Sequence, residues 1–220
     1  MDWVALALSV KLALCTCAAV LPIALGLATY LALGPRRGRG LLEAVVALPL
    51  VLPPTVIGFY LLMVFGPRYS PVGAWLDSIG LGLVFSFGGL VVGSVLYSLP
   101  FAVQPMAAAL RGVPLELIDV ARSAGATRWR TLTRVVWPLG MPGIVVGMVL
   151  TFAHTLGEFG IVMMIGGARP GITKTASIAV YEDVQTGEFA RAGWTSAVLI
   201  AIALACIVPL GMLRERWWRR

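Results

Sequence analysis

AVVALPLVLPPTVIGFYLLMVF, residues 44–65, contains no aspartate, glutamate, lysine or arginine. A helix needs about 20 predominantly apolar residues to cross the hydrocarbon core of a bilayer, so this stretch is long enough to span a membrane. Four further charge-free stretches have a similar length, namely residues 12–34, 83–110, 135–157 and 192–213. The chain is therefore predicted to be an all-α membrane protein with five transmembrane helices. A single transmembrane domain over residues 1–220 is expected, with spans over about 10–33, 43–65, 84–110, 137–165 and 192–213.

The composition supports a membrane protein rather than a soluble domain. Of the 220 residues, 59% are hydrophobic and 12% are charged, and the mean hydropathy is +0.92. A soluble domain carries about 25% charged residues, so this chain has too little charge to cover its surface in water. The formal net charge is +7, but the arginines are spread over short loops at the span ends. This distribution favours orientation in a membrane and contact with anionic lipid, and no nucleic-acid partner is expected.

The three cysteines give no sign of a metal site. They lie inside predicted spans and have no metal-ligand spacing with a histidine: Cys15, Cys17 and Cys206. Free cysteines in such positions behave as small buried apolar side chains. Neither a disulfide nor a bound metal is predicted.

The distribution of basic residues predicts the orientation of the chain. Bases concentrate after the first, third and fifth spans: Arg36, Arg37, Arg39, Arg111, Arg122, Arg128, Arg130, Arg134, Arg214, Arg216, Arg219 and Arg220. The other side has fewer bases and more acids: Lys11, Arg68, Arg169, Lys174, Arg191, Asp2, Asp77, Glu182, Asp183 and Glu188. Cytoplasmic loops are enriched in arginine and lysine. The N-terminus is therefore predicted outside and the C-terminus inside, and residues 111–134 lie in the cytoplasm.

Residues 111–134 have a helical pattern that an orienting basic loop does not need. Apolar residues at 117, 118, 120, 121 and 124 recur at helical spacing, Gly125 interrupts them, and TRWRTLTR then resumes a helical rhythm. Glycine permits a sharp bend because it has no Cβ. Two short helices that meet at Gly125 are predicted, and Pro138 is expected in the first turn of the fourth span. A basic loop that only orients the chain is the alternative.

This segment resembles the cytoplasmic signature of membrane subunits in bacterial ABC importers, the binding-protein-dependent transport inner-membrane family. The signature reads Glu-Ala-Ala, three residues, Gly, nine residues, Ile, one residue and Leu-Pro. The chain has Asp119-Val120-Ala121, then Gly125, then Val135, then Trp137-Pro138 at the same spacing. Asp replaces Glu, Val replaces the first Ala and Ile, and Trp replaces Leu, so Gly125 and Pro138 are the firmest anchors.

The resemblance implies that this segment is a coupling helix that docks into a groove of an ATP-hydrolysing subunit. The coupling residues that it implies are Asp119, Ala121, Gly125, Ala126, Arg128 and Pro138.

Two further stretches resemble the permease subunit of molybdate importers. They are LPLVLPPTVIGFYLL at 48–62 and FAHTLGEFGIVMMIGG at 152–167, and the resemblance extends from about Leu12 to Tyr181. The first stretch favours molybdate, whereas LGEFG also resembles sulfate and thiosulfate permeases. Sulfate, thiosulfate and tungstate therefore stay open as alternative substrates. The resemblance also implies a bacterial inner membrane, a homodimer of permease subunits, two cytoplasmic ATP-binding subunits that use ATP and Mg, and an extracytoplasmic molybdate-binding protein.

The chain itself is not expected to hydrolyse ATP or to bind a cofactor. A phosphate loop of the form G-x-x-x-x-G-K-[ST] is absent, and the nearest text, GGARPGITKT at 166–175, has Ile172 at the lysine position. Such a loop needs its lysine on the phosphates. The energy for transport must therefore come from a partner.

The spans offer no fixed cation to an anion, because no span interior between residues 12 and 165 holds a lysine or arginine. A path for an anion is expected to use hydroxyls and backbone dipoles, which bind weakly enough to release it. The candidate hydroxyls are Thr55, Ser86, Ser94, Ser98, Thr151 and Thr155. The alternative for each is a hydrogen bond to the i−4 carbonyl of its own helix.

Prolines are expected to break the second and third spans. These are Pro49, Pro53, Pro54, Pro100 and Pro105. Irregular backbone at membrane depth survives only against protein or a watery cavity. The stretch around Pro53 and Pro54 is therefore predicted to face the subunit interface and the translocation path. By contrast, G-x-x-x-G at 89–93 and at 143–147 permits close helix packing.

Glu158 is the one acid within an apolar run, and an intramembrane acid is a functional candidate by default. Its place near the outer end of the fourth span suggests a structural or gate role, with a helix-end N–H or a hydroxyl as partner. His154 is expected to be a hydrogen-bonded packing residue. The two lie four residues apart on one helix face, which leaves a membrane enzyme open. An ion-coupled secondary transporter is a further alternative, although it is expected to show inverted repeats and intramembrane charges.

Overall fold

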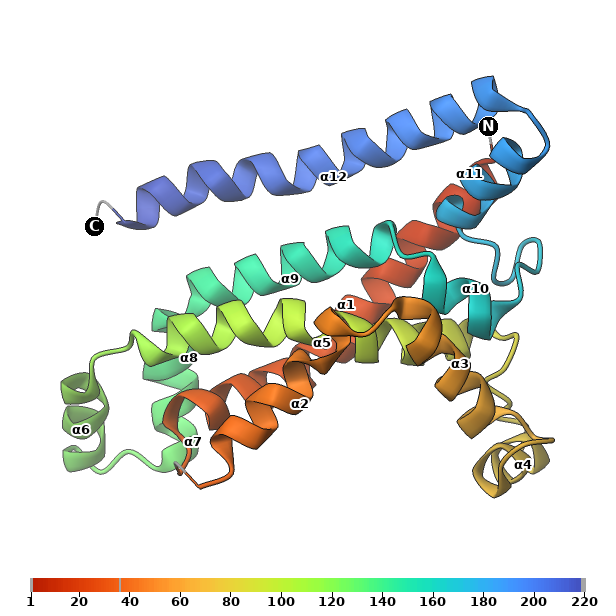
Figure 1. The fold of residues 1–220 in the computed structure, drawn as a ribbon. Helices are drawn as coiled ribbons and strands as arrows, with labels where there is room; N and C mark the ends of the chain where they lie inside the picture. Colours follow the sequence, from red (N-terminus) through yellow and green to blue (C-terminus); the bar gives the residue numbers. More distant parts are fainter. Residues whose placement is uncertain (1, 36, 219–220) are drawn as a thin grey trace.

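The computed structural model describes residues 2–35 and 37–218, with side chains described to Gly211. Within these residues all regular secondary structure is helical. Three long helices are apolar enough to cross a membrane: α1 (Trp3–Leu33), α5 (Phe87–Arg111) and α12 (Phe189–Trp218), the last judged over Phe189–Gly211 (Figure 1). Arg36, Arg219 and Arg220, which the orientation prediction uses, lie outside the described residues, as do the side chains of Arg214 and Arg216.

Two bent helix pairs could supply the remaining spans. One pair is α2 (Arg39–Val51) with α3 (Pro54–Phe65), bent by 108°, and the other is Arg128–Leu139 with α9 (Met141–Leu156), bent by 71°. The described residues therefore hold three candidate spans, or up to five if each bent pair is one span. The five-span map and its orientation stay predictions.

The core lies where α1, α5 and α9 pack side by side. Val20, Ala24 and Ala28 of α1 are fully buried in the same cluster as Ala102, Val103 and Met106 of α5. The predicted close contact at 143–147 is present, because a Cβ added at Gly147 would lie 2.7 Å from the carbonyl oxygen of Ala102. Small residues let two backbones approach in this way.

A second core holds α10 (Gly160–Gly166) between α3 and the first half of α5. Its buried members include Leu61, Leu90, Ile161 and Ile165. A Cβ at Gly58 of α3 would lie 2.7 Å from the Cβ of Met164, so these two short helices also touch through glycine.

The prolines act differently in the two helices that contain them. The second span breaks at Leu52 and Pro53, and α3 starts at Pro54, as predicted for Pro53 and Pro54. The expectation that Pro49 also interrupts this span is wrong, because α2 runs through it to Val51. The expectation that Pro100 and Pro105 interrupt the third span is wrong, because α5 runs unbroken through both. Each proline removes one hydrogen bond, but the continuous packing of α5 along α1 and α9 holds the helix together.

The fourth predicted span, 137–165, is not one helix. A π-helical turn, η1 (Leu132–Val136), leads into α8 (Trp137–Leu139), and the chain then bends at Gly140 into α9, which ends at Leu156. Pro138 therefore lies in α8, and Pro142 occupies the first turn of the long helix α9, so the prediction that Pro138 occupies the first turn of the fourth span is wrong. Pro138 has no backbone N–H to donate in this segment. Just before it, the backbone N–H of Trp137 donates to the carbonyl of Leu132, five residues earlier, which is the π-helical hydrogen bond of η1.

Short helices lie at two opposite ends of the molecule. The short helices α6 (Leu115–Ser123) and α7 (Arg128–Thr131) lie at one end, and α4 (Pro71–Ser78) and α11 (Ala176–Gln185) lie at the other (Figure 1). This separation agrees with the predicted grouping of residues into two sides.

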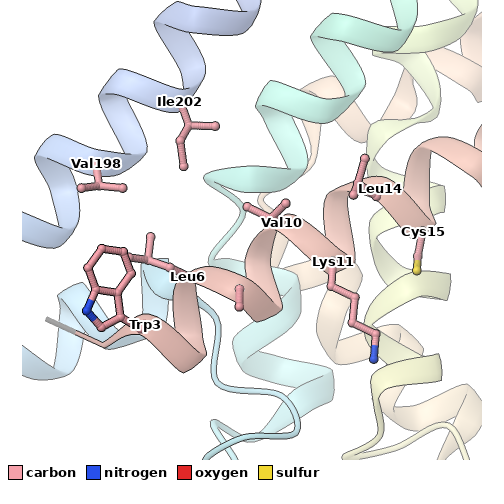
Figure 2. A pocket seen from close by; sticks show the side chains of 9 residues that line it. Trp3, Leu6, Val10, Lys11, Leu14, Cys15, Val198 and Ile202 are labelled. Carbon is pink, nitrogen blue, oxygen red and sulfur yellow. The ribbon is translucent and has the colours of Figure 1, made fainter.

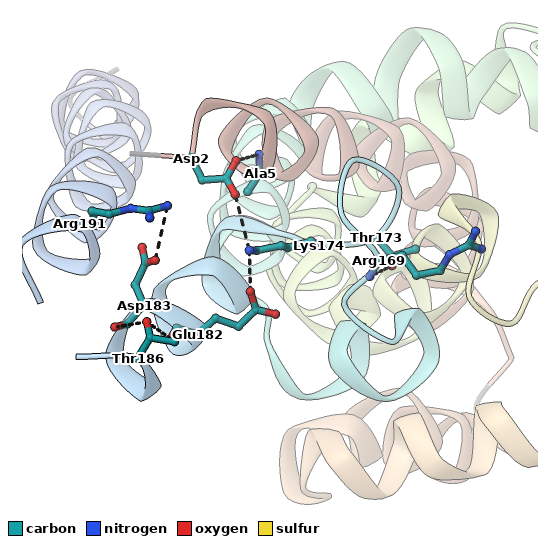
Figure 3. A network of polar contacts seen from close by, with 9 residues as sticks. All are labelled: Asp2, Ala5, Arg169, Thr173, Lys174, Glu182, Asp183, Thr186 and Arg191. Atoms are coloured by element: carbon teal, nitrogen blue, oxygen red, sulfur yellow. Dashed lines mark hydrogen bonds and ion pairs between the residues drawn. The ribbon is translucent and has the colours of Figure 1, made fainter. Parts of the chain in front are cut away.

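A network of ion pairs ties the start of α1 to α11 and α12 at the second end (Figure 3). Lys174 Nζ lies 2.6 Å from Glu182 Oε2 and 3.8 Å from Asp2 Oδ2, and Arg191 lies 3.7 Å from Asp183. The hydrogen bond to Glu182, with help from the nearby acids, raises the pKa of Lys174 above its usual value. Residues assigned to one side by the sequence therefore meet at one end of the structure.

Candidate functional site

The breaks in the second and fourth predicted spans meet at one place. A Cβ added at Gly160, the first residue of α10, would lie 2.9 Å from the Cβ of Pro54, the first residue of α3. The backbone N–H groups of Thr55 and Gly160 have no hydrogen-bond partner within the described residues, as expected in the first turn of a helix. A groove of about 400 Å³ opens here, lined by Pro54, Thr55, Tyr97, His154, Gly157, Glu158, Phe159 and Gly160.

Two predicted hydroxyls form a buried bridge between α5 and α9 beside this groove. Ser98 Oγ lies 3.0 Å from Thr155 Oγ1 and 3.0 Å from His154 Nδ1. Both hydroxyl residues are almost fully buried. They therefore bond across the helix interface, and the alternative of a bond to their own helix is wrong for this pair.

Three other predicted polar side chains are buried without a partner. Within the described residues, Ser94 Oγ, Thr151 Oγ1 and both carboxylate oxygens of Glu158 make no hydrogen bond, and Glu158 is only 4% exposed. The hydroxyl of Ser94 nevertheless lies close enough to the Glu158 carboxyl to act on it, although no hydrogen bond of standard geometry joins them, so a hydroxyl partner for Glu158 stays a prediction. Buried polar groups without partners are costly and rare in folded proteins. Such groups indicate a site that is completed by water, by another chain or by a second conformation.

Of the remaining candidates for the path, Pro54 and Thr55 line the groove and Pro53 precedes them in the chain. Pro53 and Thr55 are exposed on the single chain, and Pro54 is half-buried. Ser86 is outside the groove and caps α5, because its hydroxyl accepts from the N–H of Gly89 and donates to the carbonyl of Leu83.

The aromatic surroundings of His154 were not predicted. Its ring stacks on Phe101 at a centroid distance of 4.0 Å and lies 4.8 Å from the ring of Tyr97. The expectation of a hydrogen-bonded packing histidine is confirmed, and in addition the residue lines the groove. Tyr97 and Phe101 are aromatic residues within a run of apolar residues, so the sequence held no signal for their contact with a residue of another helix.

A larger cavity lies between α1 and α12 and has different chemistry (Figure 2). It measures about 600 Å³ and is lined by Trp3, Leu6, Ala7, Val10, Lys11, Leu14, Cys15, Val198 and Ile202. Lys11 is its one charged group, and the ammonium lies 4.6 Å from the ring centre of Phe87 in a cation–π contact. The apolar lining offers an anion little to bind and suits lipid chains better.

The cytoplasmic signature forms a compact turn with defined hydrogen bonds. Gly125 has φ +82° and follows the end of α6. The N–H of Gly125 donates to the Arg122 carbonyl, and the N–H of Ala126 donates to the Ala121 carbonyl. This is the Schellman motif, in which a left-handed glycine lets the last helical carbonyls find partners. Thr127 then caps α7 by accepting from the N–H of Arg130. The predicted pair of short helices that meet at Gly125 is confirmed.

The outer surface of this turn is apolar and exposed. Leu115, Val120 and Trp129 are each about two-thirds exposed at 64%, 67% and 65%, whereas Ile118 is buried against the bundle. Trp137, which stands at the Leu position of the signature, contacts Trp129 edge-on and donates from Nε1 to the hydroxyl of Thr29 in α1. Large apolar side chains exposed on a well-anchored segment are candidates for a surface that binds another protein.

The other coupling candidates lie on this turn as well. Asp119 and Arg128 are exposed, and neither makes an ion pair within the described residues. Pro138 is exposed at the start of α8. The segment thus presents apolar and charged groups that no described part of the chain uses.

Comparison with known families shows to which protein family the chain belongs. The family described as "Binding-protein-dependent transport system inner membrane component" matches residues 21–215. The chain belongs to this family. It is therefore an inner-membrane transport component that works with a binding protein, as the cytoplasmic signature suggested.

Two relatives are molybdenum transport system permease proteins, both named ModB. The protein from Azotobacter vinelandii is 42% identical over 95% of this chain and 92% of its own length. The one from Escherichia coli K12 is 38% identical over 100% of this chain and 94% of its own length. The sulfate transport system permease protein CysT of Escherichia coli K12 is 31% identical over 83% of this chain and 66% of its own length.

Solved structures support the fold. A bacterial alginate ABC transporter in complex with a periplasmic protein superposes with a TM-score of 0.76 at 20% identity, over 97% of this chain and 78% of that chain. The MetNI methionine ABC transporter superposes with a TM-score of 0.68 at 17% identity, over 98% of this chain and 93% of that chain. The chain therefore has the fold of an ABC importer membrane subunit.

Proposed function

We propose that the chain is the permease subunit of an ATP-driven importer and that its substrate is molybdate. The main support is the match to molybdenum transport permeases at 42% and 38% identity over nearly the full length of both chains. The match to a sulfate permease is lower in identity and covers less of that protein. Tungstate and sulfate are the alternative substrates.

The groove at the two chain breaks is proposed as part of the translocation path. It presents the hydroxyl of Thr55, the imidazole of His154 and the free backbone N–H groups of Thr55 and Gly160, and none of its lining residues is a lysine or arginine. These groups donate hydrogen bonds to a tetrahedral oxyanion without a fixed positive charge. A fixed cation in a low-dielectric site would hold a dianion tightly, whereas transport needs release.

A second copy of the chain is proposed to cover the groove. Irregular backbone is tolerated at membrane depth only against protein or a watery cavity. The exposed Pro53 and Thr55 and the open groove beside them lie at such irregular backbone. In a homodimer this face of one copy would meet the same face of the other, with the path between them.

The exposed turn around Gly125 is proposed to couple transport to ATP hydrolysis. Its apolar residues Leu115, Val120 and Trp129 suit a groove on a cytoplasmic ATP-binding subunit, and Asp119 and Arg128 are free to pair with charges there. Two such subunits would hold the ATP and Mg. The opposite end, with α4 and α11, would receive an extracytoplasmic molybdate-binding protein.

The test is uptake by a reconstituted complex. The permease, its ATP-binding partner and its binding protein are assembled in liposomes, and entry of labelled molybdate, tungstate and sulfate is measured with ATP inside or outside. Molybdate uptake that needs both ATP on the cytoplasmic face and loaded binding protein is the expected result. Uptake of sulfate but not molybdate would show that the substrate is sulfate. Uptake that is driven by an ion gradient without ATP would support a secondary transporter instead.

A further inference from the structure

We infer that His154 contacts the oxyanion in transit and that the Thr155–Ser98 bridge fixes its tautomer so that Nε2 carries the proton. This inference rests on the proposed function, because it assigns a residue to the path through which the oxyanion moves. It follows from the geometry around the ring.

The ring of His154 is held so that only one edge is free. Phe101 stacks on it with an interplanar angle of 25°, and Tyr97 packs at 50°. Ser98 Oγ lies 3.0 Å from Nδ1 and is the hydrogen-bond partner of that nitrogen. Nε2 has no hydrogen-bond partner within the described residues, and the residue lines the groove. The free nitrogen is therefore the group that the side chain can offer to a ligand.

The hydrogen-bond bridge decides which nitrogen carries the proton. The hydroxyls of Ser98 and Thr155 are buried, and each has one proton to donate. If Thr155 donates to Ser98 and Ser98 donates to Nδ1, both protons are satisfied. If Nδ1 carries the proton and donates to Ser98, one of the two buried hydroxyl protons has no acceptor among the described residues. Buried donors are nearly always satisfied, so the first arrangement is favoured and Nε2 is the N–H.

A neutral N–H donor suits the ligand class. A fully deprotonated tetrahedral oxyanion has only acceptors, and it takes a hydrogen bond from an imidazole N–H without needing a charge there. Thr55, on the same groove, adds a hydroxyl and a backbone N–H. Glu158 is the one acid of the groove, and both of its oxygens are buried and thus withdrawn from the open space. His154 is the central donor of this set because it is the one whose orientation is locked.

The tautomer can be measured directly, because His154 is the single histidine of the sequence. The permease is labelled with ¹⁵N-histidine, assembled with unlabelled partners in lipid, and studied by solid-state NMR with and without molybdate. We expect a protonated Nε2, an unprotonated Nδ1 and a change at Nε2 when molybdate is loaded and ATP turnover is arrested. Ser98→Ala is the control, and it should produce a mixture of tautomers. A dominant Nδ1–H form in the wild-type complex would overturn the inference.

The second measurement is the rate of uptake by two variants of His154. His154→Phe keeps an aromatic ring between Phe101 and Tyr97 but removes both nitrogens, whereas His154→Gln keeps a donor. Loss of a hydrogen bond to a charged ligand corresponds to about a tenfold or greater fall in uptake rate at limiting substrate. We expect that fall for His154→Phe, a smaller fall for His154→Gln, and unchanged assembly for both. His154→Phe should also lower the melting temperature, because the buried hydroxyl of Ser98 loses its acceptor. Wild-type uptake by His154→Phe would refute the contact.

Uptake by the wild-type complex separates the hypothesis about the substrate from the hypothesis about the role of His154. If the wild-type complex takes up sulfate or tungstate but not molybdate, the proposed substrate is wrong, and the same two variants are then compared with the oxyanion that is taken up. If the wild type takes up molybdate and His154→Phe is as active as the wild type, the proposed function stands and the role of His154 is wrong.

Discussion

Replacing Gly125 tests whether the exposed turn around this residue acts as a docking element. Its φ of +82° lies in the left-handed region, where an L-residue with a Cβ is strained. A Cβ at this position would meet nothing within 4 Å, so a substitution adds no clash and acts through the backbone alone. The spans do not contain this residue, and membrane insertion should be normal.

The expected magnitude follows from that conformation. An alanine in the left-handed region costs about 1–2 kcal/mol, and a β-branched valine is at the upper end of about 1–3 kcal/mol for backbone strain. The free turn can escape the strain by giving up its two Schellman hydrogen bonds, but docking into a groove of fixed shape requires the original conformation. The affinity for the ATP-binding subunit should therefore fall about tenfold for Gly125→Ala and further for Gly125→Val.

Two matched variants separate backbone strain from the loss of a glycine. Asparagine tolerates the left-handed conformation, so Gly125→Asn should dock nearly as well as the wild type. Gly112 ends α5 at the start of the same segment with φ −78°, and a Cβ there would come no closer than 3.4 Å to the Ala109 carbonyl, so Gly112→Ala should be neutral.

The assay is a titration of the purified ATP-binding subunit onto each permease variant in lipid nanodiscs, together with uptake in liposomes. The expected order of affinity is wild type, Gly112→Ala and Gly125→Asn together, then Gly125→Ala, then Gly125→Val. If Gly125→Val binds its partner and transports like the wild type, the segment is only an orienting basic loop and the coupling hypothesis is wrong.

Three further predictions address the rest of the chain. In a cysteine-free background, Ser78→Cys should react with impermeant thiol reagents in intact cells and Ser123→Cys only with permeant ones, since both side chains are exposed at opposite ends; equal labelling of the two would contradict the predicted orientation. Glu158→Gln should keep much of the transport, whereas Glu158→Leu should raise the thermal stability of the subunit and abolish uptake, because the buried carboxyl has no partner within the described residues; a lower melting temperature for Glu158→Leu would show that the carboxyl has a stabilising partner. Lys174→Met should lower the melting temperature by a few degrees, consistent with about 1 kcal/mol for partly exposed ion pairs to Asp2 and Glu182. Because the pKa of Lys174 is raised above its usual 10.5, its contribution is fully present below that value and is lost only as the pH rises through the raised pKa. The difference between Lys174→Met and wild type should therefore be constant between about pH 6 and about pH 9, and a difference that disappears within this range would show that another group controls the network.

The membrane class and the turn at Gly125 were predictable from the sequence because each depends on local information. Charge-free stretches such as 12–34 and 83–110 coincide with long apolar helices, because transfer into lipid depends on the residues themselves. The turn at Gly125 was predictable because only glycine readily takes a left-handed angle after a helix that must end. The break at Pro53 was predictable for a similar reason, since two consecutive prolines remove two backbone donors.

The tertiary structure alone decided where the breaks meet and which polar groups share the groove. Single prolines in apolar runs were also expected to break their spans, yet α2 passes through Pro49 and α5 passes through Pro100 and Pro105 unbroken. In α5, packing against neighbouring helices compensates for the lost hydrogen bonds. The contact of Gly160 with Pro54 and the bridge from Ser98 to Thr155 and His154 join residues far apart in the chain. Such contacts depend on how helices cross, and side-chain hydrogen bonds form only when that crossing brings donors and acceptors within about 3 Å. The hydroxyls could therefore be identified as candidates from the sequence, whereas His154 was expected only to pack, and the arrangement of these residues as one site required the packed fold.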